Sequence, residues 1–362
     1  MDLAKAFNTV DPGILLQKLE KYGIRGLPLK LISSYLSERY QYTYTNNTKS
    51  SLKQVHKGVP QGSSLGPLLF LIFINDLPLA TNMTVRMFAD DACLSFNHPD
   101  PQTLQDTVNK ELKLVNNWLV DNKLYLNEKK TTYIIFTNKH ISHKFKISIN
   151  NNELKQSIST KYLGIIIDEK LNWKKHIKNL RSKLASNNYA LLRLRNFVDE
   201  DTLVTIYYSL IYSHLQYCIS TWGKASKTNI KPIESMQKRA LRNMFNLSPC
   251  SHTNPVFSSK KILKLKDIYK FQLGKLTYKI TKNQMVGGNP FVNLNKQHKY
   301  STRSSLNNNF IQPGRRTEVG IRSFKYQAPL IWREIPLFIK ESNSFNIFKL
   351  RFKKHLISKY SI

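Results

Sequence analysis

The spacing of apolar residues predicts amphipathic helices in the first third of the chain. One begins at the Asp-Pro pair 11–12, a typical helix start, and ends before Gly23, which can take the left-handed conformation that terminates helices. A short second helix is expected over residues 29–36. A longer one opens at the Asp-Pro pair 100–101. Its apolar stripe recurs every three or four residues and consists of Leu104, Val108, Leu112, Val115 and Leu119.

Alternation of apolar and polar positions predicts strands between these helices. Segment 41–55 is typical of a hairpin, with the Asn-Asn pair 46–47 in its turn. The runs 84–88 and 92–96 predict a second hairpin, whose tight turn contains residues 89–91. Mixed helices and strands indicate an α+β fold for this part of the chain. Further strands are expected at 133–136, 145–149 and 162–167.

The pattern changes at two places. Residues 68–74 are apolar on every side, which indicates a helix buried within the protein. Past Trp173 a long helix with many basic positions is expected, and helices dominate to about Tyr278. The stretch 283–316 is rich in Asn, Gly and Ser and predicts a long loop. A basic helix over 345–356 follows; we expect it to pack on the preceding helices, with a membrane surface or a partner as alternatives.

The charge balance adds a class of partner. The chain has 362 residues, with 56 Lys and Arg against 23 Asp and Glu, and a formal net charge of +33. Such an excess of one sign repels itself unless a polyanion neutralises part of it, so nucleic acid is the expected partner. The content of 41% hydrophobic and 11% aromatic residues favours a folded chain over a disordered one.

No membrane partner and no disulfide partner are expected. The longest apolar run, 65–74, is interrupted by a glycine and a proline and is half the length of a membrane span, which needs about 20 residues. No signal peptide is visible. Cys93, Cys218 and Cys250 form no CxxC pair and are too few for a disulfide framework or a structural zinc site. A reducing, intracellular compartment is therefore expected.

Asp90 and Asp91 are the strongest local signal for chemistry. Adjacent carboxylates on a hairpin turn favour a divalent cation, and apolar flanks such as Phe88 and 92–96 indicate a turn that emerges from core strands. Burial would raise the pKa of these carboxyl groups unless a cation compensated it. The simpler alternative is a solvated turn, because Asp is common in turns for its own side-chain hydrogen bonds.

A site for two magnesium ions, about 3.5 to 4 Å apart, also needs a carboxylate from a second element. Asp2, Asp11, Asp76 and Asp121 are candidates, and the residues alone leave this choice open. Asp11 is better explained as a helix cap. Asp76 lies at the end of the apolar helix, where turn chemistry suffices to explain it.

Three segments resemble a known family. DLAKAFNTV (2–10), GVPQGSSLGPLLF (58–70) and FADD (88–91) are similar to polymerase motifs A, B and C of reverse transcriptases from non-LTR (LINE-type) retrotransposons, in particular the jockey-like group. Their order and spacing agree with the family. The resemblance continues through 118–131 as motif D and 161–164 as motif E, the primer grip. Beyond the polymerase core it extends over 209–222, 316–332 and Pro336.

The resemblance implies roles for the catalytic residues. Asp2, Asp90 and Asp91 would hold Mg²⁺ or Mn²⁺, with the backbone carbonyl of Leu3 as a further oxygen ligand. The metal would activate the primer 3′-hydroxyl and neutralise charge on the triphosphate. Lys130 would donate a proton to pyrophosphate or pair with its charge, and a solvated lysine is the alternative.

It also implies a nucleotide site. Phe7 stands where the family places an aromatic ring against the sugar, so that a 2′-hydroxyl has no room and deoxynucleotides are selected. A plain core aromatic is the alternative for Phe7. Gln61 and Gly62 would lie along the incoming nucleotide, with glycine allowing close backbone approach and glutamine offering an amide. An ordinary proline-containing turn is the alternative for these two residues.

By the same resemblance, the chain is a right-hand polymerase palm, an antiparallel sheet with helices, followed by a helical thumb and a helical C-terminal region. The primer grip would be Tyr162, Leu163 and Gly164. Thumb residues would contact the nucleic-acid backbone without reading bases: Lys178, Arg181 and Lys183. The expected divisions are the palm 1–170, thumb and connection 171–282, a polar loop or linker 283–320, and a basic C-terminal helical segment 321–362.

Two positions depart from the family pattern. Asn8 stands where a second acidic residue is common, which leaves the metal position Asp2 unchanged. Met1 directly precedes Asp2, so the sequence is expected to be N-terminally truncated, starting at motif A without the fingers region. In the family the fingers carry basic residues that grip the triphosphate. We therefore expect the chain by itself to show little templated synthesis.

The function implied is RNA-directed DNA synthesis, a two-metal nucleotidyl transfer to a primer 3′-hydroxyl. Its partners would be an RNA template, a DNA primer and deoxynucleoside triphosphates, with the nucleus as the compartment suggested by the family. The alternative is a catalytically inactive remnant that only binds RNA or RNA–DNA hybrid, which the basic composition alone would explain.

Overall fold

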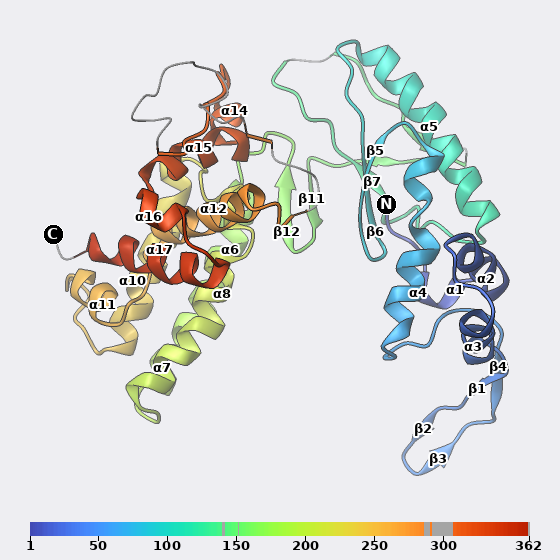
Figure 1. The fold of residues 1–362 in the computed structure, drawn as a ribbon, viewed down its shortest axis with the longest axis horizontal. Coiled ribbons are helices and arrows are strands. Elements are labelled where there is room, and N and C mark those ends of the chain that lie inside the picture. Colours follow the sequence, from blue (N-terminus) through green and yellow to red (C-terminus); the bar gives the residue numbers. More distant parts are fainter. Residues whose placement is uncertain (140–141, 151, 286–289, 292–306, 361–362) are drawn as a thin grey trace. The chain divides into compact units, whose positions relative to one another are not determined.

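The computed structural model describes residues 1–139, 142–150, 152–285, 290–291 and 307–360 (Figure 1). Within it the chain forms two compact units, Met1–Leu163 and Gly164–Ile362. The first unit mixes helices and strands, and the second is mostly helical. The expected α+β class is therefore confirmed.

Two helices of the first unit begin at the aspartate caps that the sequence predicts. The Asp11 side chain accepts a hydrogen bond from the Ile14 amide at 3.1 Å, and Asp100 accepts one from the Thr103 amide at 2.7 Å. Gly23 ends its helix with a φ of +92°. The predicted helices are confirmed, and so is the capping role of Asp11. The helices are α1 (Ala6–Thr9), α2 (Pro12–Lys21), α3 (Leu27–Leu36), α4 (Leu65–Ile74), the 3₁₀ helix η1 (Leu77–Ala80) and α5 (Pro101–Asp121).

Both predicted hairpins are present in the first unit. In one, β1 (Arg39–Gln41) pairs with β4 (Lys53–Val55), and β2 (Tyr44–Thr45) pairs with β3 (Thr48–Lys49). The two asparagines 46–47 form its turn, both with positive φ. In the other hairpin, antiparallel strands are joined by the two residues 89–90. Its strands are β5 (Thr84–Phe88) and β6 (Asp91–Ser95).

The strands expected at 133–136 and 145–149 are shorter than predicted. Only β7 (Thr132–Tyr133) and β8 (Ser148–Ile149) form there, paired respectively with β10 (Lys155–Gln156) and β9 (Asn152–Glu153). Side chains of α5 take the place of a neighbouring strand in this region. Gln105 accepts the Lys146 amide at 2.7 Å, and Asn109 accepts the Ser148 amide at 3.0 Å.

The prediction of a single strand over 162–167 is wrong. The chain forms two strands there, β11 (Ser159–Tyr162) and β12 (Ile165–Asp168). Between them Leu163 and Gly164 have φ values of +44° and +81°, which reverse the chain. Gly164 is the sequence signal for this turn, because an isolated glycine inside a strand pattern indicates a bulge or a turn.

The expectation that α4 is buried on all sides is also wrong. Leu69, Phe70, Phe73 and Ile74 are buried, but Leu68 is 52% exposed. Leu65 and Leu71 lie on the same outer face of the helix and are exposed as well. The buried face of α4 forms the core of the first unit together with residues of α2 and α5, among them Leu15, Leu19, Val115 and Leu119.

The second unit has the helices predicted past Trp173. They are α6 (Lys174–Leu194), α7 (Glu200–Tyr207), a π-helical turn (Tyr208–Tyr212), α8 (Ser213–Gln216), α9 (Ile219–Trp222), α10 (Lys227–Met244), α11 (Asn254–Ser259), α12 (Leu265–Thr281), α14 (Glu318–Arg322), α15 (Phe324–Glu334), α16 (Leu337–Lys340) and α17 (Phe345–Ser358). Much of the predicted loop 283–316 lies outside the described residues. Its described portion contains no helix.

The last helix packs into the core of the second unit. Phe348 of α17 stacks on Tyr278 of α12, with ring centroids 4.3 Å apart. Phe352 lies against Gly274 so closely that a Cβ there would meet its ring at 2.4 Å. Packing of this helix on the preceding ones is therefore confirmed. None of the helices in the described ranges is long and apolar enough to cross a bilayer.

Candidate active site

A short extended segment at the start of the chain positions Asp2. Asp2 forms an antiparallel bridge with Asp91 of β6, and Leu3 forms one with Leu126. On the Leu126 side, the Asn127 amide donates to the Asp2 carbonyl at 2.8 Å. Residues directly opposite each other in an antiparallel pair direct their side chains to the same face. The pairing therefore places the Asp2 and Asp91 carboxylates on one face.

The β5–β6 turn places Asp90 beside this pair. Phe88 and Asp91 are paired across the hairpin, and Ala89 has a φ of +51°. Asp90 and Asp91 are both half-buried. Ala92 is buried as the sequence indicates, but Phe88 is 65% exposed, so only one of the two flanks lies in the core. The turn is therefore partly open to solvent.

Lys130 lies close to Asp2. Its ammonium nitrogen is 3.8 Å from Asp2 Oδ2, and the lysine side chain is largely exposed. The neighbouring Thr131 is buried, and its hydroxyl accepts a hydrogen bond from the Asp2 amide at 3.3 Å and donates to the Asn127 carbonyl at 3.0 Å. The segment 127–131 thus holds the backbone of Asp2 and brings a cation to its carboxylate.

Phe7, Gln61 and Gly62 also come together. The Phe7 ring lies 4.5 Å from the Phe70 ring of α4, centroid to centroid, and Phe7 is half-buried. Gln61 donates its amide hydrogen to Asn8 Oδ1 at 2.9 Å. Gly62 has a φ of +81°, and a Cβ there would meet nothing within 4 Å. An open, left-handed glycine leaves room for another molecule to approach the backbone.

Backbone hydrogen bonds join the loop before α4 to the segment around α1. The Gly58 amide donates to the Val10 carbonyl at 2.7 Å, and the Val59 amide donates to the Phe7 carbonyl at 2.9 Å. At Gly58, where φ is +84°, a Cβ would lie 2.7 Å from the Asn8 Cα. Only glycine permits this approach, which ties the two predicted nucleotide-site segments together.

Two ion pairs stabilise the same part of the first unit. The Asp11 cap accepts a hydrogen bond from the Lys123 ammonium at 2.7 Å. Lys123 and the other hydrogen bonds of this aspartate lower the pKa of Asp11, although partial burial opposes them. Lys18 donates to Asp76 at 2.7 Å, and burial lowers the pKa of Lys18. Asp11 and Asp76, two of the four candidate metal ligands, are thus engaged by lysines.

Tyr162, the first predicted primer-grip residue, lies in the first unit with Asp91. Burial raises the pKa of Tyr162, and the charges of Cys93 and Asp91 raise it further. Its hydroxyl therefore stays neutral through the physiological range and remains a hydrogen-bond donor. Leu163 follows in the turn after β11.

The remaining predicted residues lie in the second unit. Lys178, Arg181 and Lys183 are exposed along α6. Lys183 and Gly164 line one hollow of about 340 Å³. No carboxylate lines this hollow, whose other residues are His176, Asn179, Leu180, Ser213, His214 and Tyr217.

Pattern reading of the sequence missed the two histidines of this hollow. Burial, and to a smaller degree Lys183, lowers the pKa of both His176 and His214. Both rings are therefore neutral at pH 7 and offer hydrogen bonds rather than charge. His176 precedes Asn179 and Lys183 by three and seven positions, a helical spacing that could have indicated a common face.

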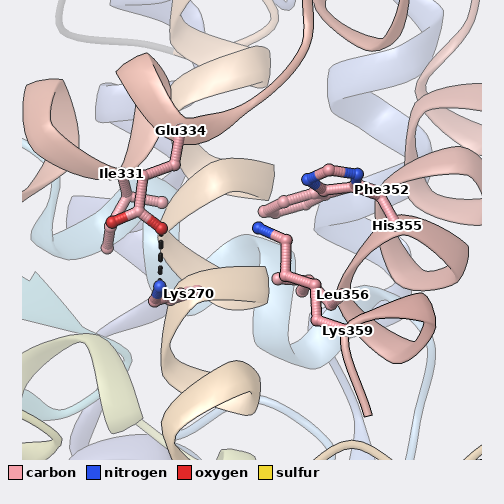
Figure 2. A pocket seen from close by; sticks show the side chains of 7 residues that line it. All are labelled: Lys270, Ile331, Glu334, Phe352, His355, Leu356 and Lys359. Atoms are coloured by element: carbon pink, nitrogen blue, oxygen red, sulfur yellow. Dashed lines mark hydrogen bonds and ion pairs between the residues drawn. The ribbon is translucent and has the colours of Figure 1, made fainter. Parts of the chain in front are cut away.

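A second, smaller pocket in this unit has no room for a ligand. It lies between α12, α15 and α17, where Lys270 and Glu334 form an ion pair of 2.5 Å opposite His355 (Figure 2). The space enclosed does not admit a water molecule.

The candidate metal site rests on the backbone pairing of Asp2 with Asp91. In the described part of the chain, no group of three or more His, Cys, Asp or Glu side chains is arranged to hold a metal ion. Magnesium does not require such a group, because it is usually bound through one or two carboxylates, waters and substrate phosphates. Carboxylate oxygens on one face are donors that fit this ion, and Lys130 lies 3.8 Å from one of them, Asp2 Oδ2.

The comparison with known families agrees with this geometry. Residues 1–167 match the family model described as reverse transcriptase (RNA-dependent DNA polymerase). This stretch contains Asp2, the β5–β6 turn and Lys130. Residues 1–167 are thus similar to reverse transcriptases, in agreement with the resemblance of the sequence motifs.

Similar proteins come from mobile elements of insects. The chain is 29% identical over 280 residues to the RNA-directed DNA polymerase from mobile element jockey of Drosophila melanogaster, which covers 74% of this chain and 30% of that protein. It is 28% identical over 254 residues to the probable RNA-directed DNA polymerase from transposon X-element of the same species, covering 67% of this chain and 27% of the relative. The chain thus spans less than a third of the length of these curated relatives.

We predict that Gly58→Ala strongly destabilises the first unit. The added Cβ would collide with backbone atoms of 7–8, which cannot move aside as a side chain could. Gly23→Ala is a matched control, because Gly23 has a similar φ of +92° but no atom within 4 Å of the added Cβ. Urea unfolding should give a loss of about 1 kcal/mol for the control and about 3 kcal/mol or more for Gly58→Ala. Equal losses would contradict the close approach.

Proposed function

We propose that this chain is the palm and thumb part of an RNA-directed DNA polymerase of a non-LTR retrotransposon. It would add deoxynucleotides to a primer 3′-hydroxyl under the direction of an RNA template. The observation that carries the proposal is the pairing of Asp2 with Asp91, next to Asp90 in the β5–β6 turn. Phosphoryl transfer depends mainly on positioning and charge stabilisation, and paired carboxylates on a fixed strand supply both.

The proposed metal site consists of Asp2, Asp90 and Asp91, with the Leu3 carbonyl as a further oxygen. When bound, Mg²⁺ or Mn²⁺ would supply Lewis-acid activation of the primer hydroxyl and neutralise triphosphate charge. Lys130 reaches Asp2 from an exposed position. That position supports a role for its ammonium group as a proton donor to pyrophosphate or as a charge partner for it.

The nucleotide site would be formed by Phe7, Gln61 and Gly62. The contact with Phe70 fixes the Phe7 ring, and a fixed ring can exclude a 2′-hydroxyl. Gly62 leaves its backbone open for contact with the nucleotide. The bond between Gln61 and Asn8 holds the glutamine amide at the edge of the same region. These contacts favour selection of deoxynucleotides by shape.

Template and primer would follow basic residues. We assign the primer grip to Tyr162, Leu163 and Gly164, and place the backbone contacts of the thumb on α6. We keep the division into a palm (1–170), thumb and connection (171–282), linker (283–320) and C-terminal segment (321–362). The exposed positions of the thumb cations support contacts to phosphates: Lys178, Arg181 and Lys183.

Primer extension on a poly(rA) template with an oligo(dT) primer and Mg²⁺ tests the proposal. Because the relatives are more than three times as long as the matched part, the assay uses this chain and the same reading frame extended upstream. We predict incorporation by the extended protein, reduced roughly a hundredfold or more by Asp90→Asn. Asp121→Asn, at an exposed position ending α5, is the matched control and should leave the rate unchanged. Undiminished synthesis by Asp90→Asn would overturn the assignment.

A salt titration tests the backbone contacts. Arg181→Gln with Lys183→Gln should lower the log–log salt slope for binding an RNA–DNA hybrid by up to about two units, since each phosphate contact contributes about 0.9. Folding should be unaffected because both side chains are exposed. Lys21→Gln with Lys30→Gln removes two exposed lysines of the first unit and should leave the slope unchanged. A flat titration for the unaltered chain would remove nucleic acid as the partner.

A further inference from the structure

The hairpin between α3 and α4 is an exposed part of the first unit. We call residues 39–55 the tyrosine arm; they comprise the paired strands β1 and β4 at its base and β2 and β3 at its tip. Figure 1 shows this arm projecting from the helices of its unit. From Gln41 to Gln54 every residue is exposed, so this stretch contributes nothing to a core. Its side chains are available to a partner.

Three tyrosines are exposed along one side of the chain path in the arm, before its turn. Tyr40, Tyr42 and Tyr44 stand at alternate positions and are 56%, 51% and 58% exposed. Tyr44 is paired with Lys49, whose ammonium nitrogen lies 5.3 Å from the centre of the Tyr42 ring. Because paired residues and their diagonal neighbours share a face, this contact places Tyr42, Tyr44 and Lys49 together. Leu52, 62% exposed, lies on the neighbouring stretch of the return strand.

The charges of the arm select the class of partner. No Asp or Glu occurs between Arg39 and Asn75. Lys49 and Lys53 are exposed on the arm, and Lys57 lies two residues after its end. Aromatic rings interspersed with cations, without carboxylates, suit a ligand that combines flat apolar surfaces with negative charge.

The base of the arm is tied to the candidate active site. The Arg39 guanidinium donates hydrogen bonds to the carbonyls of Lys57 and Gly58. Gly58 is the residue whose backbone lies against Phe7 and Asn8. Through Arg39, the surface that would bind a ligand is therefore connected to the loop that leads to Gln61 and Gly62.

We propose that the tyrosine arm binds single-stranded nucleic acid, with unpaired bases stacked on Tyr40, Tyr42 and Tyr44 and phosphates near Lys49 and Lys53. A duplex is disfavoured because its bases already stack on one another and offer no free faces to the rings. This proposal rests on the proposed function in one respect: the bound strand would be the RNA template, before it reaches the polymerase site. The binding itself depends on stacking of bases on the tyrosines and on attraction between phosphates and the lysines.

Fluorescence anisotropy with the full chain and a labelled 20-nucleotide oligo(rU) tests the arm. Replacing the three tyrosines by serine should weaken binding about tenfold or more, since each base stacked on an aromatic ring contributes measurably to affinity. Replacing them by phenylalanine keeps the rings and should keep binding within about twofold. Phe197→Ser removes an exposed aromatic outside the arm, where Phe197 is 82% exposed, and should have no effect. Oligo(dT) of equal length distinguishes DNA from RNA as the bound strand.

A 20-base-pair RNA–DNA hybrid, circular dichroism and light scattering complete the test. Hybrid affinity and the unfolding curve should be the same for the serine variant and the unaltered chain. The proposal is overturned if the serine variant binds oligo(rU) as tightly as the unaltered chain. It is also overturned if phenylalanine weakens binding as much as serine does, or if only self-association changes. No step of this test needs polymerisation, so failure of primer extension would leave the arm assignment standing.

Discussion

The pairing of Asp2 with Asp91 of β6 on one side, and of residues 2–4 with 125–127 on the other, is the constraint on which the site depends. A strand bonded on both sides cannot rotate, so the side chain of Asp2 is held on the face that also carries Asp91. The same backbone bonds bring Lys130 and Thr131 to this strand. One short stretch of backbone pairing thus brings together a ligand pair and a cation from three distant parts of the sequence.

The nucleotide segments are attached to this strand by equally short-range contacts. The bonds from Gly58 and Val59 to Val10 and Phe7 connect the loop before α4 with α1 and its C-terminal end, a few residues after Asp2. The contact of Phe7 with Phe70 then joins α1 to the buried face of α4. The site therefore derives its geometry from the core of the first unit, although the side chains of Gln61 and Lys130 are exposed.

The helices were largely predictable because one face of each meets a core. The stripe of α5 and the caps Asp11 and Asp100 follow from local chemistry, and so does the β5–β6 hairpin, although its turn is 89–90 and not the predicted 89–91. Tertiary contacts decided the rest. Side chains of α5 satisfy the backbone near Ser148, and the outer face of α4 stays exposed although its sequence is uniformly apolar.

The residues of the site were predictable in part, but their contacts with one another were not. Motif resemblance named Asp2, but nothing in the residues between Asp2 and Asp91 shows that they pair across a sheet. The nearness of Lys130 to Asp2 depends on the chain path after α5. His176 and His214 join one hollow only because α6 and α8 lie together, and no local pattern indicates that.

Manganese binding tests the paired-carboxylate site most directly, since Mn²⁺ can replace Mg²⁺ and is visible by electron paramagnetic resonance. A titration of the full chain should show bound Mn²⁺, with an affinity that falls at least about tenfold in Asp2→Asn and equally in Asp91→Asn. Asp121→Asn should bind as the unaltered chain does. Unchanged Mn²⁺ affinity in folded Asp2→Asn or Asp91→Asn protein would contradict the account.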